Sequence, residues 1–186
     1  GFKTNNIDCN DNNANINPYA AEICGNSTDD DCDGNTDSEV NKALHFNGTG
    51  HNVSIPNIPY EEFFTVEAWV KPSSVAGWHY RIFEWAGKSS LALYDNKFAW
   101  DENGIGSLGG PNLADGQWHH IALVHNGYTG NNIIGYVDGE QVLSTSVAFN
   151  ATTNATTNIG RNFTGGLDDV RYWNTALTQA QIQARM

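Results

Sequence analysis

Apolar and polar residues alternate over most of the chain, in short segments that glycine and asparagine turns separate. Residues 63–71 show the pattern most clearly, because successive side chains of an extended segment point to opposite sides. Phe64, Val66, Ala68 and Val70 share one face, which is apolar enough for a core between two sheets. The other face, from Phe63 to Trp69, mixes aromatic, hydroxyl and charged groups, and we expect it to form a partly exposed concave surface.

The same alternation predicts strands at regular spacing. They cover residues 43–47, 51–55, 63–71, 80–85, 89–94, 97–101, 117–125, 132–138, 140–146, 156–161 and 166–173. Turn signals separate them, namely "NG" at 47–48, "DN" at 95–96, and "DG" at 115–116 and 138–139. One helix is expected in the C-terminal "LTQAQIQARM", with Thr178 as its N-cap. This pattern predicts an all-β antiparallel sandwich or jelly roll.

Residues 1–39 do not follow the strand pattern. They contain few large apolar residues, many turn formers, and nine acidic residues against one lysine, a net charge of −8. Residues 40–186 contain twelve acidic and eight basic residues, a net charge of −4. The first segment cannot bury much apolar surface, so a metal and disulfides should order it. We therefore divide the chain into a small metal-binding segment, 1–39, and a β-sandwich domain, 40–186.

The acidic stretch "DDDCDGNTD" at residues 29–37 has the spacing of a calcium loop. A charge run of this kind is usually a solvated patch. Here, however, aspartates fall at positions 1, 3, 5 and 9, and a glycine falls at position 6, where a calcium loop turns sharply. The predicted ligands are the side chains of Asp29, Asp31, Asp33 and Asp37, and the backbone carbonyl of Asn35.

All three cysteines, Cys9, Cys24 and Cys32, lie in the acidic segment. Clustered cysteines in a module with little core predict disulfides and an extracellular location, either secreted or at the cell surface. A zinc site is the weaker alternative, because the neighbours are hard carboxylates and residues 1–39 contain no histidine. Three is an odd number, so either one thiol is free or its partner lies upstream of Gly1 in a longer chain.

Several function classes are disfavoured by what the sequence lacks. It has no basic patch for nucleic acid or an anionic membrane, and no apolar run of about 18 residues for membrane insertion. It also has no E-x-D-x-x-E or G-x-S-x-G pattern, and Glu67 is the only acid on its strand. The adjacent pairs Asp168–Asp169 and His119–His120 should point to opposite sides. We therefore expect a protein without catalytic activity.

Two further sets of residues are candidates for surface chemistry. The first consists of aromatic residues at or beside turns, a candidate glycan-binding platform: Trp78, His79, Tyr80 and Trp100. Trp69, Trp118 and Trp173 lie within predicted strands and should pack instead. The second set consists of N-x-S/T sequons at Asn26, Asn47, Asn52, Asn150, Asn154 and Asn162. They are glycosylation sites in a host that glycosylates exported proteins, or chance products of an Asn/Thr-rich surface.

The stretch "IDCNDNNANINPYAAEICGNSTDDDCDGNTDSE" resembles the MopE-type metal-binding motif of bacterial and archaeal surface proteins. Tyr19 stands where the family usually has glycine, and Asn10 where it often has aspartate. The family usually has a further upstream cysteine, which implies a Cys24–Cys32 pair and a Cys9 bonded upstream. The family name refers to copper, but the segment contains no histidine, tryptophan or methionine, so we expect calcium. The resemblance extends the expected metal ligands to Asp8, Asn10, Asp11, Asn13 and Glu22.

Residues 43–186 resemble a laminin-G-like, concanavalin A-like jelly roll. The resemblance lies in "ALHFNGTGHNVSIP", "FTVEAWVKP", "DGQWHHIALVHNG", "GYVDGEQV", "IGRN" and "GGLDDVRYWNTALTQAQIQ". It implies carbohydrate or protein binding, often with one calcium ion. That ion would lie at Asp168, after "GGL", with Asn47 at the opposite edge of the same site. The alternative is an ordinary turn asparagine and a surface aspartate.

Together these features predict a calcium-stabilised extracellular module for cell-surface adhesion or carbohydrate recognition, with a glycan or a surface protein as its partner. One alternative is a spacer that calcium rigidifies in a surface filament or large adhesin. Another is an accessory binding domain of a polysaccharide-degrading enzyme.

Overall fold

The computed structural model forms two compact units, Gly1–Ala43 and Leu44–Met186, which we describe separately. The sequence analysis placed the boundary after residue 39. The structure describes residues 9–10, 13–18, 20, 28–30, 32, 34, 43–48, 50–73, 80–85, 89–102, 105–130, 132–146 and 156–186.

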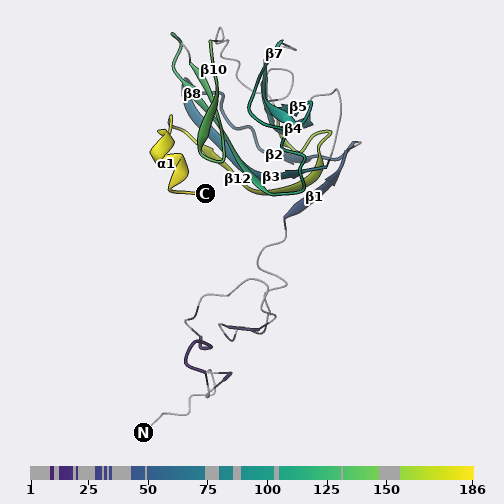
Figure 1. Cartoon of the computed structure of the whole chain (residues 1–186), viewed down its shortest axis with the longest axis vertical. Helices are drawn as coiled ribbons and strands as arrows, with labels where there is room; N and C mark the ends of the chain where they lie inside the picture. Colours follow the sequence, from purple (N-terminus) through teal and green to yellow (C-terminus); the bar gives the residue numbers. More distant parts are fainter. Residues whose placement is uncertain are drawn as a thin grey trace. The chain divides into compact units, whose positions relative to one another are not determined.

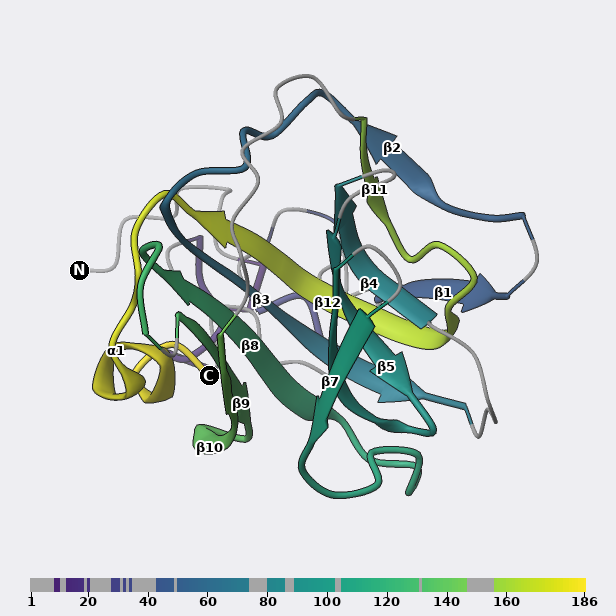
Figure 2. The ribbon, with the colours of Figure 1, turned by 90° about the horizontal axis from the view of Figure 1, so that it is seen from above.

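The larger unit consists of two facing six-stranded sheets (Figures 1 and 2). Sheet A has the order β1 (Leu44–Asn47), β12 (Thr164–Trp173), β3 (Phe63–Pro72), β8 (His119–Asn126), β9 (Ile133–Val137) and β10 (Glu140–Thr145). Sheet B has the order β2 (Val53–Ile55), β11 (Thr157–Ile159), β4 (Tyr80–Trp85), β5 (Ser89–Tyr94), β6 (Lys97–Glu102) and β7 (Ile105–Gly109). All neighbouring strands are antiparallel. The predicted antiparallel β-sandwich is confirmed.

The inward face of β3 agrees with the alternation of its sequence. Phe64 and every second residue through Val70 are fully buried in the core between the sheets. The outward face differs from the prediction, because Thr65 and Glu67 are fully buried as well. The C-terminal segment covers them, and the Leu177 N–H donates to the Thr65 hydroxyl at 2.9 Å. At the two ends of this face, Phe63 is exposed and Trp69 is half-buried, so only its middle differs from the expected partly exposed surface.

Two predicted hairpin turns have the backbone conformation that their sequences favour. Asp95 and Asn96 both have positive φ (48° and 61°) and connect β5 to β6. Asp138 and Gly139 (49° and 77°) connect β9 to β10 in the same way. Two successive positive φ angles match the right-handed twist of the flanking strands, which explains the preference for Asp, Asn and Gly.

The strand β7 was not predicted. Its sequence, "IGSLG", has two glycines and no clear alternation. It forms because it pairs with β6, and because Gly109 allows a close approach to β10 of the other sheet. A Cβ atom at Gly109 would lie 2.2 Å from the Val142 carbonyl oxygen. The strand therefore depends on contacts that are remote in the sequence.

The C-terminal helix α1 (Gln179–Gln183) packs on the outer face of sheet A (Figure 1). Thr178 is its N-cap, as predicted, and forms a capping box with Gln181. Ile182 is buried against Ala122, Val124 and Tyr136 of β8 and β9. Within the parts of the chain that the structure describes, no helix has the length and apolar character needed to cross a membrane.

In the N-terminal unit, a disulfide joins Cys9 to Cys32, with a Cα–Cα distance of 5.5 Å. The predicted Cys24–Cys32 pair is therefore wrong. The chain folds back on itself between the two cysteines, and the Asn17 N–H donates to the Asp30 carbonyl at 2.9 Å. This return brings Cys32 to Cys9 without a partner from upstream. Cys24 lies outside the described residues.

His119 connects two turns through both nitrogens of its ring. Its Nδ1 lies 2.8 Å from an oxygen of Asp138, and its Nε2 lies 3.0 Å from an oxygen of Asp115. Burial alone would lower the pKa of His119, but the hydrogen bonds and charges of Asp138 and Asp115 outweigh burial and raise this pKa. The imidazolium form can donate at both nitrogens, so protonation favours this arrangement.

Alanine substitutions at two glycines, Gly160 and Gly50, can distinguish a steric clash from backbone strain. Gly160 and Gly50 have nearly equal φ (75° and 74°), but a Cβ at Gly160 would lie 2.2 Å from the buried Phe46 ring, whereas Gly50 has open space. We expect Gly50→Ala to cost about 1 kcal/mol from the left-handed conformation. Gly160→Ala should cost about 1–3 kcal/mol more, because the added methyl group would overpack the core against Phe46. Urea unfolding followed by tryptophan fluorescence measures both; equal losses would contradict the assigned clash.

The His119 interactions predict a pH-dependent stability. Because the folded pKa is raised above the ordinary value of 6.5, the contribution of His119 is fully present below pH 6.5 and is lost as pH rises through the folded pKa. The free energy of unfolding of wild type should exceed that of His119→Gln most at pH 5.5, and the difference should shrink by pH 8.5. His45→Gln, which removes an exposed imidazole from the same domain, is the matched control substitution. A difference that does not vary with pH would refute the idea that protonated His119 stabilises the fold through Asp138 and Asp115.

Candidate functional site

The predicted aromatic platform is not assembled as expected. Trp100 is fully buried, so its assignment to a binding surface is wrong. It alternates with Ala99 and Asp101 on β6 and shares the inward face with Phe98, where it belongs to the core. Tyr80 is half-buried and packs against the same core. Trp78 and His79 lie outside the described residues.

The tryptophans that were expected to pack are less uniform. Trp69 and Trp173 are half-buried, and Trp69 contacts the His120 ring with 5.4 Å between centroids. Trp118 is more exposed, but its indole lies against Gly166, where a Cβ atom would come within 2.7 Å of the ring.

A row of polar side chains crosses the outer face of sheet B. The strand register places Asn158 opposite Glu84, Glu84 opposite Ser90, and Ser90 opposite Asp101. These residues come from four adjacent strands, β11, β4, β5 and β6, and all of them are buried. Glu84, for example, lies between Phe83 and Trp85 on β4, which both face the core. Sequence analysis missed this row because its members lie far apart in the chain.

Glu84 is the centre of the hydrogen bonds in this row. Arg161 Nη1 donates to both carboxylate oxygens, at 2.9 and 3.1 Å. Arg81 Nε lies 3.1 Å from Oε1, and the Asn158 amide donates to Oε2 at 3.3 Å. Asn52 in turn donates to the Asn158 side-chain oxygen at 2.9 Å. The carboxylate is therefore saturated with donors, as a buried charge must be.

Two arginines, Arg81 and Arg161, contact the row and are counted with it below. They differ from its four buried residues in their access to solvent. The side chains of Arg81 and Arg161 are 25% and 47% exposed, whereas that of Glu84 is only 4% exposed. The Arg81 backbone N–H also donates to the Arg161 carbonyl at 3.0 Å, which holds the two residues together. Arg81 Nη2 lies 3.8 Å from Asp101. The result is a pair of guanidinium groups that the buried Glu84 holds in place and that are partly exposed to solvent.

Ser90 adds an unused polar group to the same row. Its hydroxyl oxygen is buried, and the described part of the chain offers it no hydrogen-bond partner. A buried hydroxyl without a partner costs free energy, so such groups often mark a place where a ligand or water binds. With two arginines and two carboxylates, the ionised groups of the row sum to zero. The row can therefore donate hydrogen bonds without a strong preference for anions.

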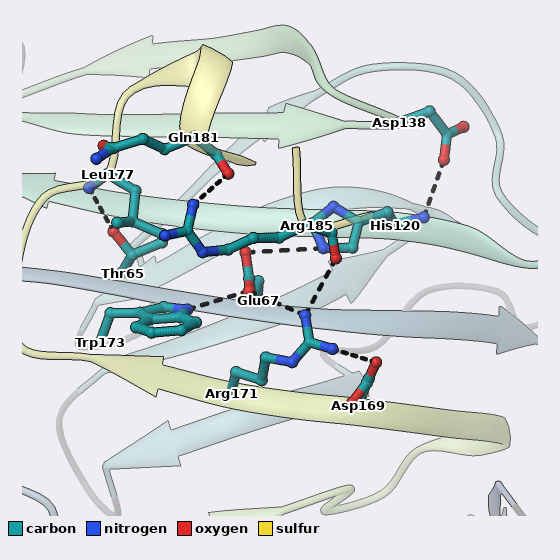
Figure 3. A network of polar contacts seen from close by, with 10 residues as sticks. All are labelled: Thr65, Glu67, His120, Asp138, Asp169, Arg171, Trp173, Leu177, Gln181 and Arg185. Carbon is teal, nitrogen blue, oxygen red and sulfur yellow. Dashed lines mark hydrogen bonds and ion pairs between the residues drawn. The ribbon is translucent and has the colours of Figure 1, made fainter. Parts of the chain in front are cut away.

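A second buried network lies on the outer face of sheet A, beneath the C-terminal segment (Figure 3). Glu67 accepts a hydrogen bond from Trp173 Nε1 at 3.0 Å and lies 3.5 Å from Arg171 Nη1 and 3.8 Å from His120 Nε2. Burial lowers the pKa of His120, although the Glu67 charge opposes the shift. Arg171 also donates to the Arg185 carbonyl at 3.1 Å. This network attaches the C-terminus to the sheet, and its centre, Glu67 with His120, is buried.

The proposed calcium ligands of the larger unit do not meet. Asn47 pairs with Thr164 on β12, four residues before Asp168, a distance of roughly 13 Å along a strand. The Asn47 side chain contacts His51, and the Asp168 carboxylate accepts the Asp169 N–H at 2.8 Å. The structure therefore does not bring Asn47 and Asp168 into one site.

In the N-terminal unit, the structure describes part of the acidic loop 29–37, namely Asp29, Asp30, Cys32 and Gly34. The Gly34 N–H donates to the Asp29 carboxylate at 3.0 Å, and Gly34 has a φ of 94°. Positions 1 and 6 of the loop are thus connected across the turn. Asn10 and Asn13 are also described, and the Asn13 side chain accepts the Asn15 N–H at 3.1 Å. The remaining predicted ligands lie outside the described residues: Asp8, Asp11, Glu22, Asp31, Asp33, Asn35 and Asp37.

The donor chemistry of this unit fits a hard metal ion. Cys9 and Cys32 are joined in a disulfide, so neither can act as a thiolate ligand for copper or zinc. Among the residues that the structure describes, no group of three histidine, cysteine or acidic side chains is close enough to hold a metal. If the loop binds an ion, aspartates beyond the described ones must complete the site.

Three of the predicted sequons can be placed. Asn47, Asn52 and Asn162 are exposed. Asn52 uses its amide to bind Asn158, so a glycan there would alter the polar row of sheet B. Asn26, Asn150 and Asn154 lie outside the described residues.

Comparison with solved structures finds the same fold in several proteins. Domain 4 of AbnA, a GH43 extracellular arabinanase from Geobacillus stearothermophilus, was solved in complex with arabinotriose. It has a TM-score of 0.62 and 22% identity, over 80% of this chain and 78% of that domain. A SAP-like pentraxin from Limulus polyphemus has a TM-score of 0.58 and 17% identity, over 75% of this chain and 78% of that one.

A protein from Bacteroides ovatus, provisionally described as carbohydrate binding, has a TM-score of 0.60 and 21% identity. The match covers 74% of this chain but only 45% of that protein. At these identities the similarities concern the fold. No curated protein is detectably similar in sequence.

Sequence profiles identify both parts of the chain. The MopE-type motif, provisionally described as metal-binding, matches residues 8–38. The profile of the concanavalin A-like lectin/glucanase superfamily matches residues 47–183. Since this match covers most of the chain and the structure has the corresponding two-sheet fold, the chain belongs to the concanavalin A-like lectin/glucanase superfamily.

Proposed function

We propose that this chain is a non-catalytic, extracellular carbohydrate-recognition module that binds neutral glycans at the outer face of sheet B. The observation that carries the proposal is the pair of solvent-accessible arginines, Arg81 and Arg161, held by the buried Glu84. Glycan recognition would serve adhesion at a cell surface. The N-terminal unit would bind calcium.

The fixed arginines suit the recognition of sugar hydroxyl groups. A guanidinium offers several N–H donors in a rigid plane, and oxygen atoms of a sugar can accept from it. Because Glu84 already orients both side chains, a ligand would not have to immobilise them, and less conformational entropy is lost on binding. The balanced charge of the row favours neutral sugars over acidic ones.

The similar proteins support a glycan as the partner. One solved relative was crystallised with arabinotriose, and another is provisionally described as carbohydrate binding. The disulfide supports an extracellular location, since such bonds persist in oxidising compartments.

The arrangement of carboxylates supports a binding role over catalysis. Glycoside hydrolysis needs two carboxyl groups on either side of the scissile bond. Glu84 and Asp101 are the pair on this face, but Arg81 lies between them, 3.1 Å from one and 3.8 Å from the other. The guanidinium occupies the space in which a scissile bond would have to lie. A Trypanosoma rangeli sialidase shares the fold, but fold similarity alone does not transfer a reaction.

A glycan array followed by calorimetric titration tests the site. We expect hits among neutral glycans, and we expect Arg161→Gln to weaken the best hit by roughly tenfold or more, as the loss of a central interface arginine does. Lys97 is a matched control, because it is an exposed cation at the start of β6, the strand that carries Asp101. Lys97→Gln should leave affinity unchanged. Equal affinity of wild type and Arg161→Gln would place binding elsewhere.

An array without hits, with or without calcium, would favour the spacer function instead. Binding confined to polymers that a neighbouring catalytic domain degrades would favour the accessory-domain function. Arg161→Gln removes a charged partner from the buried Glu84, so its melting temperature should fall below that of wild type. Both proteins are therefore titrated well below the melting temperature of the variant, where each is folded.

Calcium should hold the N-terminal unit together. An ion that binds only the folded form adds stability by mass action, and without it the five acidic residues of 29–37 repel one another. We expect a chelator to increase proteolysis within residues 1–39 and to leave the tryptophan fluorescence of the larger unit unchanged. Asp31→Ala should weaken calcium binding more than Asn12→Ala, since only Asp31 belongs to the alternating loop. Protease sensitivity that is unaffected by chelator would refute the calcium proposal.

A further inference from the structure

A pocket of about 440 Å³ lies where β3 begins and β12 ends, and it is built from residues that the sheet B row does not use. Its lining consists of Glu61, Glu62, Phe63 and Asn174. Phe63 is the first residue of β3, Glu61 and Glu62 directly precede it, and Asn174 directly follows β12. The pocket is therefore attached to two central strands of sheet A.

One exposed aromatic ring, Phe63, lines this pocket, and a second, Tyr128, directly follows Gly127, against which Phe63 packs. Phe63 and Tyr128 are 44% and 49% exposed, among the most exposed large apolar side chains of the described chain. Phe63 packs on Gly127, where a Cβ atom would lie 3.5 Å from the ring. The Gly127 N–H donates to the Glu62 carbonyl at 3.1 Å, so the two segments are fixed relative to each other. Large apolar rings kept at the surface by rigid neighbours are typical of binding sites.

Within the part of the chain that the structure describes, the negative charge of the pocket has no cationic partner. Glu67, Glu84 and Asp169 each have an arginine within ion-pair distance, but no cation of the described residues pairs with the carboxylate of Glu61 or Glu62. The two charges act on their aromatic neighbours. Burial, Glu62 and Glu61 raise the pKa of Tyr128, and burial together with Glu61 raises the pKa of Tyr172 to about 12. The pocket therefore combines uncompensated negative charge with exposed aromatic surface.

We propose that this pocket binds a sugar that carries a free ammonium group, an amino sugar that is not N-acetylated. The C–H face of the sugar would pack on Phe63 and Tyr128, and its ammonium group would pair with Glu61 and Glu62. A cation beside aromatic rings gains a further attraction from their π-electrons. Asn174 adds an amide that can bind sugar hydroxyl groups, which the side chain of a lysine on a partner protein lacks.

Calorimetric titration of the full chain with a glucosamine tetramer, at pH 6 and 150 mM salt, tests the proposal. The fully N-acetylated tetramer is the matched ligand, because it keeps the hydroxyl groups and loses the charge. We expect the free amine to bind at least tenfold more tightly. The Glu61→Gln/Glu62→Gln double variant should lose this preference, since it removes both charges at nearly unchanged volume. Glu140→Gln, an exposed acid on β10, should keep it.

Three outcomes would overturn the inference. Equal affinity for the acetylated tetramer would exclude recognition of the ammonium group. Binding that persists in the double variant would place the sugar on the acidic N-terminal segment, whose net charge is −8. Equally tight binding of tetralysine would exclude a sugar as the specific occupant. Arg161→Gln should bind the glucosamine tetramer like wild type, which separates this pocket from the sheet B site.

Discussion

The contact between Phe64 and Trp85 joins the two sheets and fixes the orientation of the strands that carry them. Phe64 lies on β3 of sheet A and Trp85 on β4 of sheet B, with 5.0 Å between ring centroids. Trp85 also donates from its indole N–H to the Ile58 carbonyl at 3.0 Å. Because side chains alternate along a strand, turning these two rings inward turns Glu67 and Glu84 outward. A slip of one residue on either strand would exchange core and surface.

The two outward glutamates are both buried, but the protein completes their surroundings differently. Glu67 lies under the C-terminal segment, where Trp173, Arg171 and His120 surround it. Glu84 is covered chiefly by Arg161 and Arg81, whose outer edges reach solvent. Removing one partner from a buried charge is costly, so both clusters should be rigid. Around Glu84 both arginines are partly exposed, at 25% and 47%, whereas around Glu67 the buried His120 and the C-terminal segment contribute as well as the partly exposed Arg171. The same device, a buried carboxylate on a central strand, thus attaches the C-terminus on one sheet and orients arginines on the other.

The N-terminal unit achieves order by other means. Of the residues described there, only Ile16 is a buried hydrophobic side chain. The covalent Cys9–Cys32 link and the hydrogen bond from Gly34 to Asp29 take the place of a core. The calcium ion that we propose for this unit would add to these two links, whereas the sandwich has an extensive core of its own. Chelation and sugar binding should therefore act on separate parts of the chain.

The sequence by itself determined every strand except β7, the two hairpin turns and the helix cap, because each depends on residues that are neighbours in the chain. The alternation of 63–71, the Asp95–Asn96 turn and Thr178 are local signals of this kind. The tertiary structure alone decided how the strands meet. Asn158 reaches Glu84 across 74 residues and Arg161 across 77, so no local pattern could reveal the polar row. Pairing with its neighbours turned Trp100 inward, and folding of the chain joined Cys9 to Cys32. Periodicity specifies which residues share a face, but the partner of each face is set by contacts between distant segments.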